Sequence, residues 1–249
     1  MPRPPSSHDD VYATVRHPFA RPASLLAART RRRRHERFFS LTGLSADARV
    51  LDVGCGRLGL RALEPGLDIT GVDLAEQPFY PGPFVRTDPA RGGLPFADYE
   101  FDLVYCSSVI EHVPPEDRNA FAAELRRVGR GWLVQTPARS FPIEPHALLP
   151  FVHWLPRPLR RAYWRLGAAD AAEEIALLSR REFESLFGPA LPERLGPIVK
   201  SWVCVRPAGG IATADRARAD ARGVRSAPQP PDVVADAADH QEHQQRDPD

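Results

Sequence analysis

The chain has 249 residues, the length of one domain with extensions or of two small domains. Hydrophobic residues make up 43% and charged residues 26% of the sequence, so collagen-like, wholly disordered and membrane-spanning classes fit it poorly. The formal net charge of +1 gives no overall reason to expect nucleic acid or a membrane as a partner. We expect a cytoplasmic protein with reduced thiols, because residues 1–10 lack the apolar stretch of a secretion signal and the three cysteines are scattered.

Composition divides the chain into three parts. Residues 1–38 are expected to form an N-terminal extension with a basic helix, whose arginine run at 31–34 is typical of a solvated surface. Residues 39–206 are expected to form one domain. Residues 207–249 contain five prolines and no aromatic residue, which predicts a disordered tail that buries too little apolar surface to fold.

Short apolar or β-branched runs within the domain predict six strands, at 49–53, 68–72, 84–86, 101–106, 131–136 and 200–205. The segments between them read as helices. One helix ends at Gly129, and another begins at a capping box formed by Ser179 and Glu182 and ends at Gly188. Strands that alternate with helices predict an α/β fold with a Rossmann-like, doubly wound parallel sheet covered on both faces.

A glycine turn follows the first predicted strand. Gly54 and Gly56 let the backbone turn sharply and approach a ligand without a Cβ in the way. Asp73 ends the next strand, 19 residues after Gly54. Both positions lie at the carboxyl edge of a doubly wound sheet, where ligands bind, and an aspartate there can accept both hydroxyl hydrogens of a ribose.

Two kinds of ligand remain open at this point. Gly54, Gly56 and Gly59 also satisfy the dinucleotide fingerprint, which makes a nicotinamide-dependent oxidoreductase an alternative. Asp52 argues against it, because a carboxylate two residues before the first glycine repels a pyrophosphate and attracts a cationic sulfonium and ammonium.

The motifs resemble those of class I S-adenosylmethionine-dependent methyltransferases, most closely the type 11, small-molecule branch. The resemblance runs from about residue 49 to 137 and rests on five motifs in order, at 50–56, 71–74, 88–98, 101–113 and 125–137. It implies a seven-stranded Rossmann-like sheet, mostly parallel with the last strand antiparallel. It also implies S-adenosyl-L-methionine as the cofactor.

Carried over by position, the resemblance implies a set of cofactor-binding residues. The methionine end would be lined by Asp52, Gly54, Cys55 and Gly56, and bordered by Cys106 and Ser107; the ribose would be held by Asp73, with Leu74 against adenine and Asp88 accepting from the adenine amino group. Two departures concern Gly59, one residue later than the family's third glycine, and Pro89, which has no N–H for the adenine ring.

His112 and Glu111 follow the fourth strand and are the candidate catalytic residues. A histidine with an ordinary pKa near 6.5 can take a proton from an acceptor hydroxyl. The alternative is that both residues only shape the loop. No metal is expected, because Ser108 stands where some quinone-precursor O-methyltransferases carry a second carboxylate.

The acceptor would be selected by residues 138–175, named the insertion from here on. Its candidate substrate residues are His146, Trp154, Arg160 and Arg161. This mixture of aromatic and arginine side chains suits a substrate lid, a peripheral membrane contact or an anionic head group. The alternative is that the apolar side chains pack on the sheet and the arginines are solvated.

Together these residues predict an S-adenosylmethionine-dependent methyltransferase that acts on a small-molecule or glycan- or lipid-linked acceptor by in-line transfer. A cofactor-binding but inactive scaffold domain is a further alternative. Nucleic acid is an unlikely acceptor, because the Asn-Pro-Pro-aromatic motif of base-amino methyltransferases is absent after the fourth strand. The sequence leaves the acceptor atom and the oligomeric state open.

Overall fold

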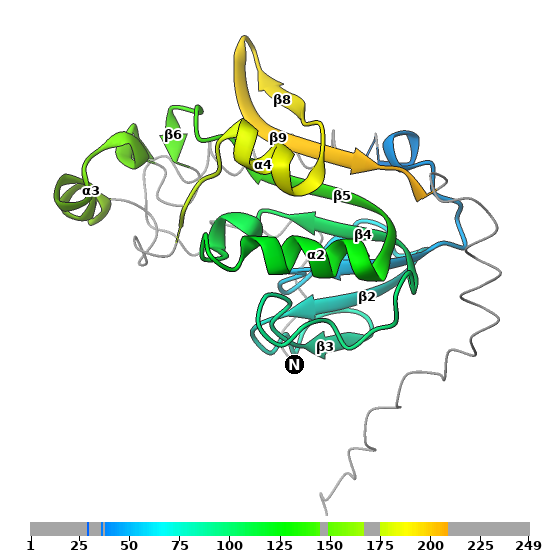
Figure 1. Cartoon of the computed structure of the whole chain (residues 1–249). Coiled ribbons are helices and arrows are strands. Elements are labelled where there is room, and N and C mark those ends of the chain that lie inside the picture. Colours follow the sequence, from blue (N-terminus) through cyan, green and yellow to red (C-terminus); the bar gives the residue numbers. More distant parts are fainter. Residues whose placement is uncertain (1–28, 30–35, 37, 145–148, 167–174, 209–249) are drawn as a thin grey trace, which may run out of the picture.

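The computed structural model describes residues 29, 36, 38–144, 149–166 and 175–208. They form a seven-stranded sheet in the order β3-β2-β1-β4-β5-β9-β8 (Figure 1). The strands are β1 (Arg49–Val53), β2 (Asp68–Asp73), β3 (Phe84–Arg86), β4 (Phe101–Ser107), β5 (Gly129–Pro137), β8 (Leu191–Leu195) and β9 (Ile198–Arg206).

Strands β1 to β5 pair in parallel, and β9 is antiparallel to both β5 and β8. This arrangement confirms the predicted fold class. In register, Val53 lies opposite Val72 on one side and Cys106 on the other, so β1, β2 and β4 end at the same level. The loops that follow these three strands therefore meet at one edge of the sheet.

The helices are α2 (Arg118–Val128), α3 (Arg157–Trp164) and α4 (Arg180–Phe187), with 3-10 turns η1 (Leu60–Ala62), η2 (Ile110–His112) and η3 (Val152–Trp154). A small hairpin joins β6 (Ile143–Glu144) and β7 (Leu149–Pro150). The predicted N-cap of α4 is confirmed, since Ser179 Oγ accepts from the Glu182 N–H at 3.2 Å, and Gly188 closes α4 with φ of 101°. The Glu182 carboxylate accepts from Arg118, a partner that the predicted capping box did not include.

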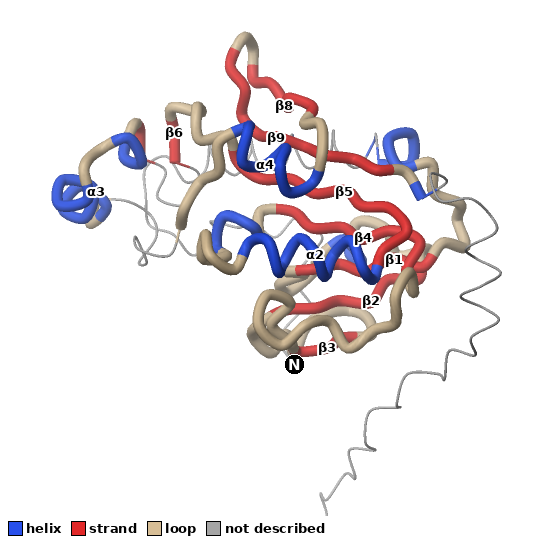
Figure 2. The backbone as a smooth tube through the Cα atoms, in the orientation of Figure 1, coloured by secondary structure: helices blue, strands red, loops and turns tan. Residues whose placement is uncertain are grey.

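The links between the first four strands differ from the expectation of helices. Residues 54–67, 74–83 and 87–100 hold no α-helix, and η1 is the one helical turn among them (Figure 2). Pro65 and Gly66 follow η1, and three prolines fall between residues 78 and 83. Proline lacks the N–H that a helix interior needs, so these links run as turns.

Apolar side chains cover both faces of the sheet. On one face, α2 and α4 bring Phe121 and Phe183 against Val104 and its neighbours (Figure 1). On the other face, Phe38 is buried against Leu103 in a second cluster. The prediction assigned Phe38 to the extension, but its ring is part of the core, so the folded domain includes it. The predicted basic helix and tail lie largely outside the described residues.

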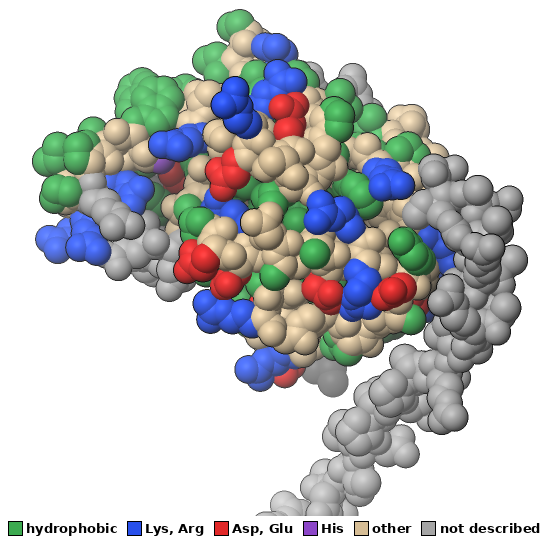
Figure 3. Space-filling view, viewed as in Figure 1, with side chains coloured by type: hydrophobic (Ala, Val, Ile, Leu, Met, Phe, Trp, Pro, Cys, Tyr) green, Lys and Arg blue, Asp and Glu red, His purple; other side chains and the backbone are tan. Residues whose placement is uncertain are grey.

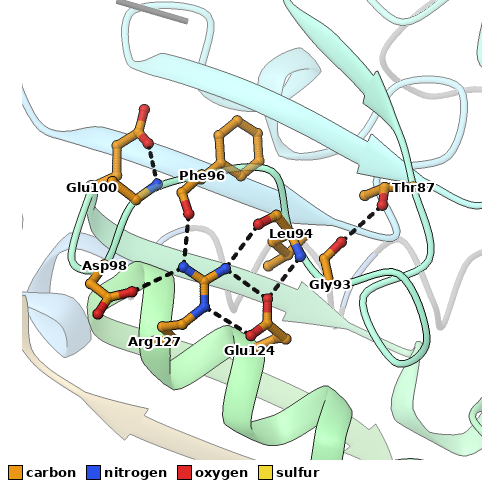
Figure 4. Close-up of polar contacts among 9 residues, drawn as sticks. Thr87, Gly93, Leu94, Phe96, Asp98, Glu100, Glu124 and Arg127 are labelled. Carbon is orange, nitrogen blue, oxygen red and sulfur yellow. Dashed lines mark hydrogen bonds and ion pairs between the residues drawn. The ribbon is translucent and has the colours of Figure 1, made fainter. Parts of the chain in front are cut away.

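A network around Arg127 fastens the link between β3 and β4 to helix α2 (Figure 4). Arg127 donates to the carbonyl oxygens of Leu94 and Phe96, each at 2.8 Å, and to the carboxylates of Glu124 and Asp98. Glu124 also accepts from the Leu94 N–H at 2.8 Å. The hydrogen bond from Arg127 holds the pKa of Glu124 below its usual range. The link that carries Asp88 is therefore fixed at its far end.

Candidate functional site

The candidate site lies at the carboxyl edge of the sheet. In Figure 1 the arrowheads of β2 and β4 point towards the side of the molecule where β6 and α3 lie. The glycine loop after β1, the link after β2 and the turn after β4 all open at this edge. The insertion therefore stands beyond the strand ends where the predicted cofactor residues gather.

The glycine loop is held by β2 and by the turn after β4. The N–H groups of Gly54 and Cys55 both donate to Val72 O, at 2.7 and 3.1 Å. Gly54 has φ of 71°, and a Cβ there would lie 2.2 Å from a methyl carbon of Val109. Gly56 has φ of 57°, but nothing lies within 4 Å of its added Cβ. Packing explains the first glycine, whereas the second borders open space that suits a ligand.

Asp73 joins the two sides of this opening. Its carboxylate accepts from the Gly56 N–H at 3.0 Å and from the Ala75 N–H at 3.1 Å. The side chain is only partly buried, and the neighbouring Leu74 is 63% exposed. A carboxylate at the mouth of a glycine loop, beside an unburied apolar side chain, fits a ribose and an aromatic base. The residues present therefore fit S-adenosylmethionine.

Asp52 lies behind the loop rather than at its mouth. Its side chain is buried, and its Oδ2 accepts from the Leu60 N–H at 2.6 Å. Burial raises the pKa of Asp52 to about 7, against a lowering by the Leu60 N–H, and the charge of Asp73 raises it further. A Cβ at Gly59 would approach the same Oδ2 to 2.2 Å. Asp52 thus shapes the loop's own backbone, and Gly59 is a glycine because Asp52 needs the space.

Sequence reasoning missed Tyr80, whose ring closes the loop from the β2 side. A Cβ at Gly71 would lie 2.6 Å from this ring, and one at Gly59 would lie 2.9 Å from it. Burial, and then the nearby Asp52, raise the pKa of the Tyr80 hydroxyl well above its usual range. Tyr80 sits in a turn between strands, and no local pattern marks it as a core residue.

The three cysteines are free and buried. Cys55 belongs to the glycine loop and Cys106 to the end of β4, as the motifs predict. Burial raises the pKa of both thiols, and the Asp52 charge adds to this rise. Their contribution to the site is therefore backbone and volume rather than a reactive thiolate.

Asp88 closes a turn at the edge of the site. Its Oδ1 accepts from the N–H groups of Ala90 and Arg91, at 2.9 and 3.3 Å. Pro89, which follows Asp88 in the sequence, is buried. This geometry is an Asx turn, which fits the common use of aspartate before proline. The side chain remains partly exposed at the same edge as Asp73.

The turn after β4 is held by Gln135, which belongs to the motif at 125–137 but had no predicted role. Ser107 and Ser108 donate their hydroxyls to Gln135 Oε1, at 2.7 and 3.1 Å. Ser108 has φ of 59°, a strained value for a residue with a side chain. Gln135 is buried on β5 and so fixes the direction in which the backbone of Ser107 faces the site.

Glu111 and His112 have different environments although they are adjacent. Glu111 is fully buried; it accepts from Thr136 Oγ1 at 3.0 Å, and its backbone oxygen accepts from the Ala176 N–H at 2.8 Å. His112 is exposed. Burial favours the structural alternative for Glu111, while the ring of His112 is accessible at the edge of the sheet.

Arg118 is a second residue that sequence reasoning missed. It is buried at the start of α2 and donates to Val113 O at 3.1 Å, to Ala176 O and to Glu182. Ala176 thus bonds to both the turn after β4 and the start of α2. These contacts tie the chain just past the insertion to the candidate catalytic turn.

The insertion has a small core of its own. Trp164 packs with Leu149 and Val152 in a third cluster, separate from the sheet. Trp154, in contrast, is 51% exposed; its Nε1 donates to Arg139 O at 2.9 Å and its ring lies 5.3 Å from that of Phe151. Arg161 is exposed and Arg160 partly so. His146 lies outside the described residues.

No group of three or more His, Cys, Asp or Glu side chains among the described residues is arranged to hold a metal ion. In the same part of the chain, none of the helices has the length and apolar character to cross a membrane.

Residues 51–133, about a third of the chain, match the model of a family described as a methyltransferase domain. Curated proteins gave no match. Similar solved structures include a protein of Pyrococcus horikoshii, with 18% identity over 69% of this chain and 87% of that one at a TM-score of 0.47. Another is 1,6-didemethyltoxoflavin-N1-methyltransferase of Burkholderia thailandensis, with 18% identity over 71% and 76% at 0.48.

A third is a SAM-dependent methyltransferase of Methanosarcina mazei, with 16% identity over 65% of this chain and 92% of that one, at a TM-score of 0.44. At such low values these likenesses identify neither an activity nor a substrate. The family match itself confirms the resemblance found in the motifs. It confirms a methyltransferase in place of a nicotinamide-dependent enzyme, and with it S-adenosylmethionine as the cofactor.

Proposed function

We propose that this chain, a methyltransferase that uses S-adenosylmethionine, methylates a small organic acceptor, either free or linked to a glycan or lipid, between the carboxyl edge of the sheet and the insertion. The proposal assigns catalysis to the domain at residues 39–206, with Phe38 added to its core. It assigns the insertion the role of a substrate lid.

The observation that carries this proposal is the position of Asp73. One carboxylate both fixes the Gly56 N–H and remains partly exposed beside Leu74. Two ribose hydroxyls can donate to it while adenine lies on Leu74. Asp88, at the same edge, would accept from the adenine amino group with the part of its carboxylate outside the Asx turn.

The methionine end would lie against backbone rather than against charged side chains. The open space above Gly56 and the end of β4 at Cys106 and Ser107 provide this surface. Asp52 would act by holding the loop through Leu60. When it is ionised, this carboxyl behind the loop favours a cationic ligand over a pyrophosphate.

Bound S-adenosylmethionine supplies an electrophilic methyl carbon on a positively charged sulfur. The chain's task is to hold the acceptor atom in line with it and to receive the acceptor's proton. We assign the proton to His112, whose exposed ring lies on the turn after β4. Glu111 would act as a positioning residue, since it joins that turn to Thr136 and Ala176.

The acceptor would be selected by Trp154, Arg160, Arg161 and His146 of the insertion. The half-exposed indole of Trp154 offers an apolar face, and the arginines offer charge for an anionic group. These assignments are supported by the position of the insertion, because the chain at its end is tied to the catalytic turn through Ala176.

Calorimetric titration with S-adenosylmethionine tests the cofactor site. Asp73→Ala should weaken binding by about 1.5 to 3 kcal/mol, since charge-assisted hydrogen bonds are lost. Asp68→Ala, at the opposite end of β2, is the matched control and should bind as the parent does. Asp73→Asn retains one acceptor for Gly56 and separates loop damage from loss of charge. Parental affinity in a folded Asp73→Ala variant would contradict the site.

His112→Ala tests the assignment of the base once an acceptor is found. The rate should fall about 100-fold or more while cofactor affinity is unchanged. The acidic limb of the pH–rate profile should also disappear, which a purely structural role would not produce. An equal rate with an intact acidic limb would leave His112 without a catalytic role.

A further inference from the structure

Helix α3 packs on the protein through one side only. At 100° per residue, Trp164 and Arg160 share one side of the helix. Trp164 is buried against Leu149 and Val152, and Arg160 is partly buried. Tyr163 is also partly buried and packs against this cluster, so these three residues mark the inner side of α3. The other residues of the helix whose side chains the structure describes are exposed, namely Pro158, Leu159, Arg161 and Ala162.

The outward side contains an apolar arc. Pro158, Leu159 and Ala162, with Leu166 in the closing turn, fall on one side of the helical wheel, and all four are exposed. Leu159 is 58% exposed and Leu166 is 67% exposed. Apolar side chains gathered on one exposed face of a helix are unusual unless something covers them.

A basic arc runs beside the apolar one. Arg161 and Arg165 are four residues apart, so they share a side of the helix, and both are exposed. The helix and its closing turn, residues 157–166, contain four arginines and no acidic residue, whereas the whole insertion contains five arginines and four acidic residues, so the basic charge is concentrated on α3. Figure 3 shows basic side chains next to hydrophobic ones at the end of the molecule that carries α3.

We infer that the outward side of α3 lies on an anionic phospholipid surface, with Leu159 and Leu166 in the apolar boundary and Arg161 and Arg165 at the head groups. Apolar and basic arcs along one exposed helix are the arrangement of interfacial helices. The inference rests on the proposed function only where it takes the lipid surface as the place at which the protein meets its acceptor. The binding itself needs no methyl transfer.

Vesicle sedimentation with the full chain tests this surface. Vesicles of phosphatidylcholine with phosphatidylglycerol should bind the protein, vesicles of phosphatidylcholine alone should bind it weakly, and high salt should release it. The other three tryptophans, Trp132, Trp164 and Trp202, are buried. A shift of tryptophan emission to shorter wavelength with vesicles would therefore report Trp154, and Trp154→Phe should abolish it.

Two double variants separate the two arcs. Leu159→Gln with Leu166→Gln should lower the vesicle partition coefficient at least about tenfold. Arg161→Gln with Arg165→Gln should lower it about 25-fold, at about fivefold for each charge near an anionic surface. The controls are Leu191→Gln with Ile198→Gln, and Arg181→Gln with Arg194→Gln, which change exposed side chains of the same kinds on β8, β9 and α4.

Controls that bind like the parent, with both α3 variants impaired, would support the inference. The inference would be overturned if the parent chain did not bind anionic vesicles, or if the α3 variants bound them as well as their controls do. Self-association that Leu159→Gln with Leu166→Gln abolishes, without vesicle binding, would assign the surface to a second protein and also overturn it. Cofactor affinity, measured on every variant, should not change, so failure here is distinct from failure of the cofactor site.

Discussion

The glycine loop and the insertion lie at the same edge of the sheet but are built in opposite ways. In the loop, two glycines are required by packing against other parts of the chain: Gly54 leaves space for Val109, and Gly59 leaves space for Asp52. In the insertion, a small core around Trp164 supports side chains that point away from the protein. The family model covers residues 51–133 and ends before the insertion begins.

This difference separates residues that the fold itself requires from residues that fit the chain to its own acceptor or partner. Glycines that are required by internal packing are required whatever the acceptor is, so the cofactor half is constrained by its own fold. Exposed Leu159 and Leu166 have no such internal reason. Features that fit the chain to its own substrate or partner are therefore expected in the insertion, where packing leaves side chains free to vary.

Trp164→Ala should have the largest effect on stability, and that effect should be confined to the insertion. Loss of a buried indole lowers local stability by about 3 to 5 kcal/mol, and the insertion should open while the sheet stays folded. Hydrogen exchange of residues 149–166 measures the opening, and calorimetry should find cofactor affinity unchanged. Trp154→Ala is the matched control, and its half-exposed ring should contribute under about 1 kcal/mol. Equal losses of stability in the two variants would contradict a separate core around Trp164 in the insertion.

Asp52→Asn should change the pH dependence of stability in the cofactor half. Burial raises the folded-state pKa of Asp52 to about 7, above its unfolded value near 3.8, so the folded state holds a proton that the unfolded state releases. The parent should lose stability as pH rises from about 4 to about 7. Asparagine should remove this loss.

Because asparagine keeps an acceptor for Leu60, the variant should be more stable than the parent above pH 7, by about 2 to 4 kcal/mol. Near pH 4 the two should be alike. Urea denaturation at a series of pH values measures the difference. A constant difference across this range would show that Asp52 does not titrate there.

Gly54→Ala and Gly56→Ala should separate packing from ligand space within the loop. Gly54→Ala should destabilise the fold by about 2 to 3 kcal/mol, because its methyl group meets Val109 at a positive φ. Gly56→Ala should lower stability by only about 1 kcal/mol, since it adds backbone strain without a collision. Cofactor affinity should fall more in Gly56→Ala. The reverse order of stabilities in urea would contradict this division.

Arg127→Gln should have a smaller effect, of about 1 to 2 kcal/mol, because the carbonyls of Leu94 and Phe96 lose their charged donor. Thermal melting measures it. Arg91→Gln breaks an exposed pair with Asp117 and should change stability by under about 0.5 kcal/mol. If both variants melt alike, the Arg127 network does not hold the link that carries Asp88.

The sequence was most informative where the structural cause is local. All six predicted strands begin and end within two residues of the observed bounds, because an apolar run flanked by glycine and proline is a local pattern. Strand β8 was missed, since Pro192 and two charged residues interrupt its apolar side chains, as an edge strand allows. The helices expected between the first strands are absent from residues 54–67, 74–83 and 87–100 because each of these links contains proline, which interrupts a helix.

Residues that act across the fold left no local signal. Gln135 reaches two serines some 27 residues earlier, and Arg118 reaches Ala176 and Glu182 about 60 residues later. Glu111 was singled out by its motif, but only the structure shows that it is buried against Thr136. Spacing along a chain identifies which residue types follow a strand, whereas contacts between distant elements decide which of them face the ligand.

The position of β9 has a consequence for how the protein is made. This strand, residues 198–206, lies between β5 and β8 and is the last of the sheet to leave the ribosome. Until it arrives, β5 exposes the backbone groups of Trp132 to Pro137 along an unpaired and strongly apolar edge. The nascent chain therefore carries an aggregation-prone strand through synthesis of the whole insertion, and a translational pause before residue 198 would lengthen that exposure.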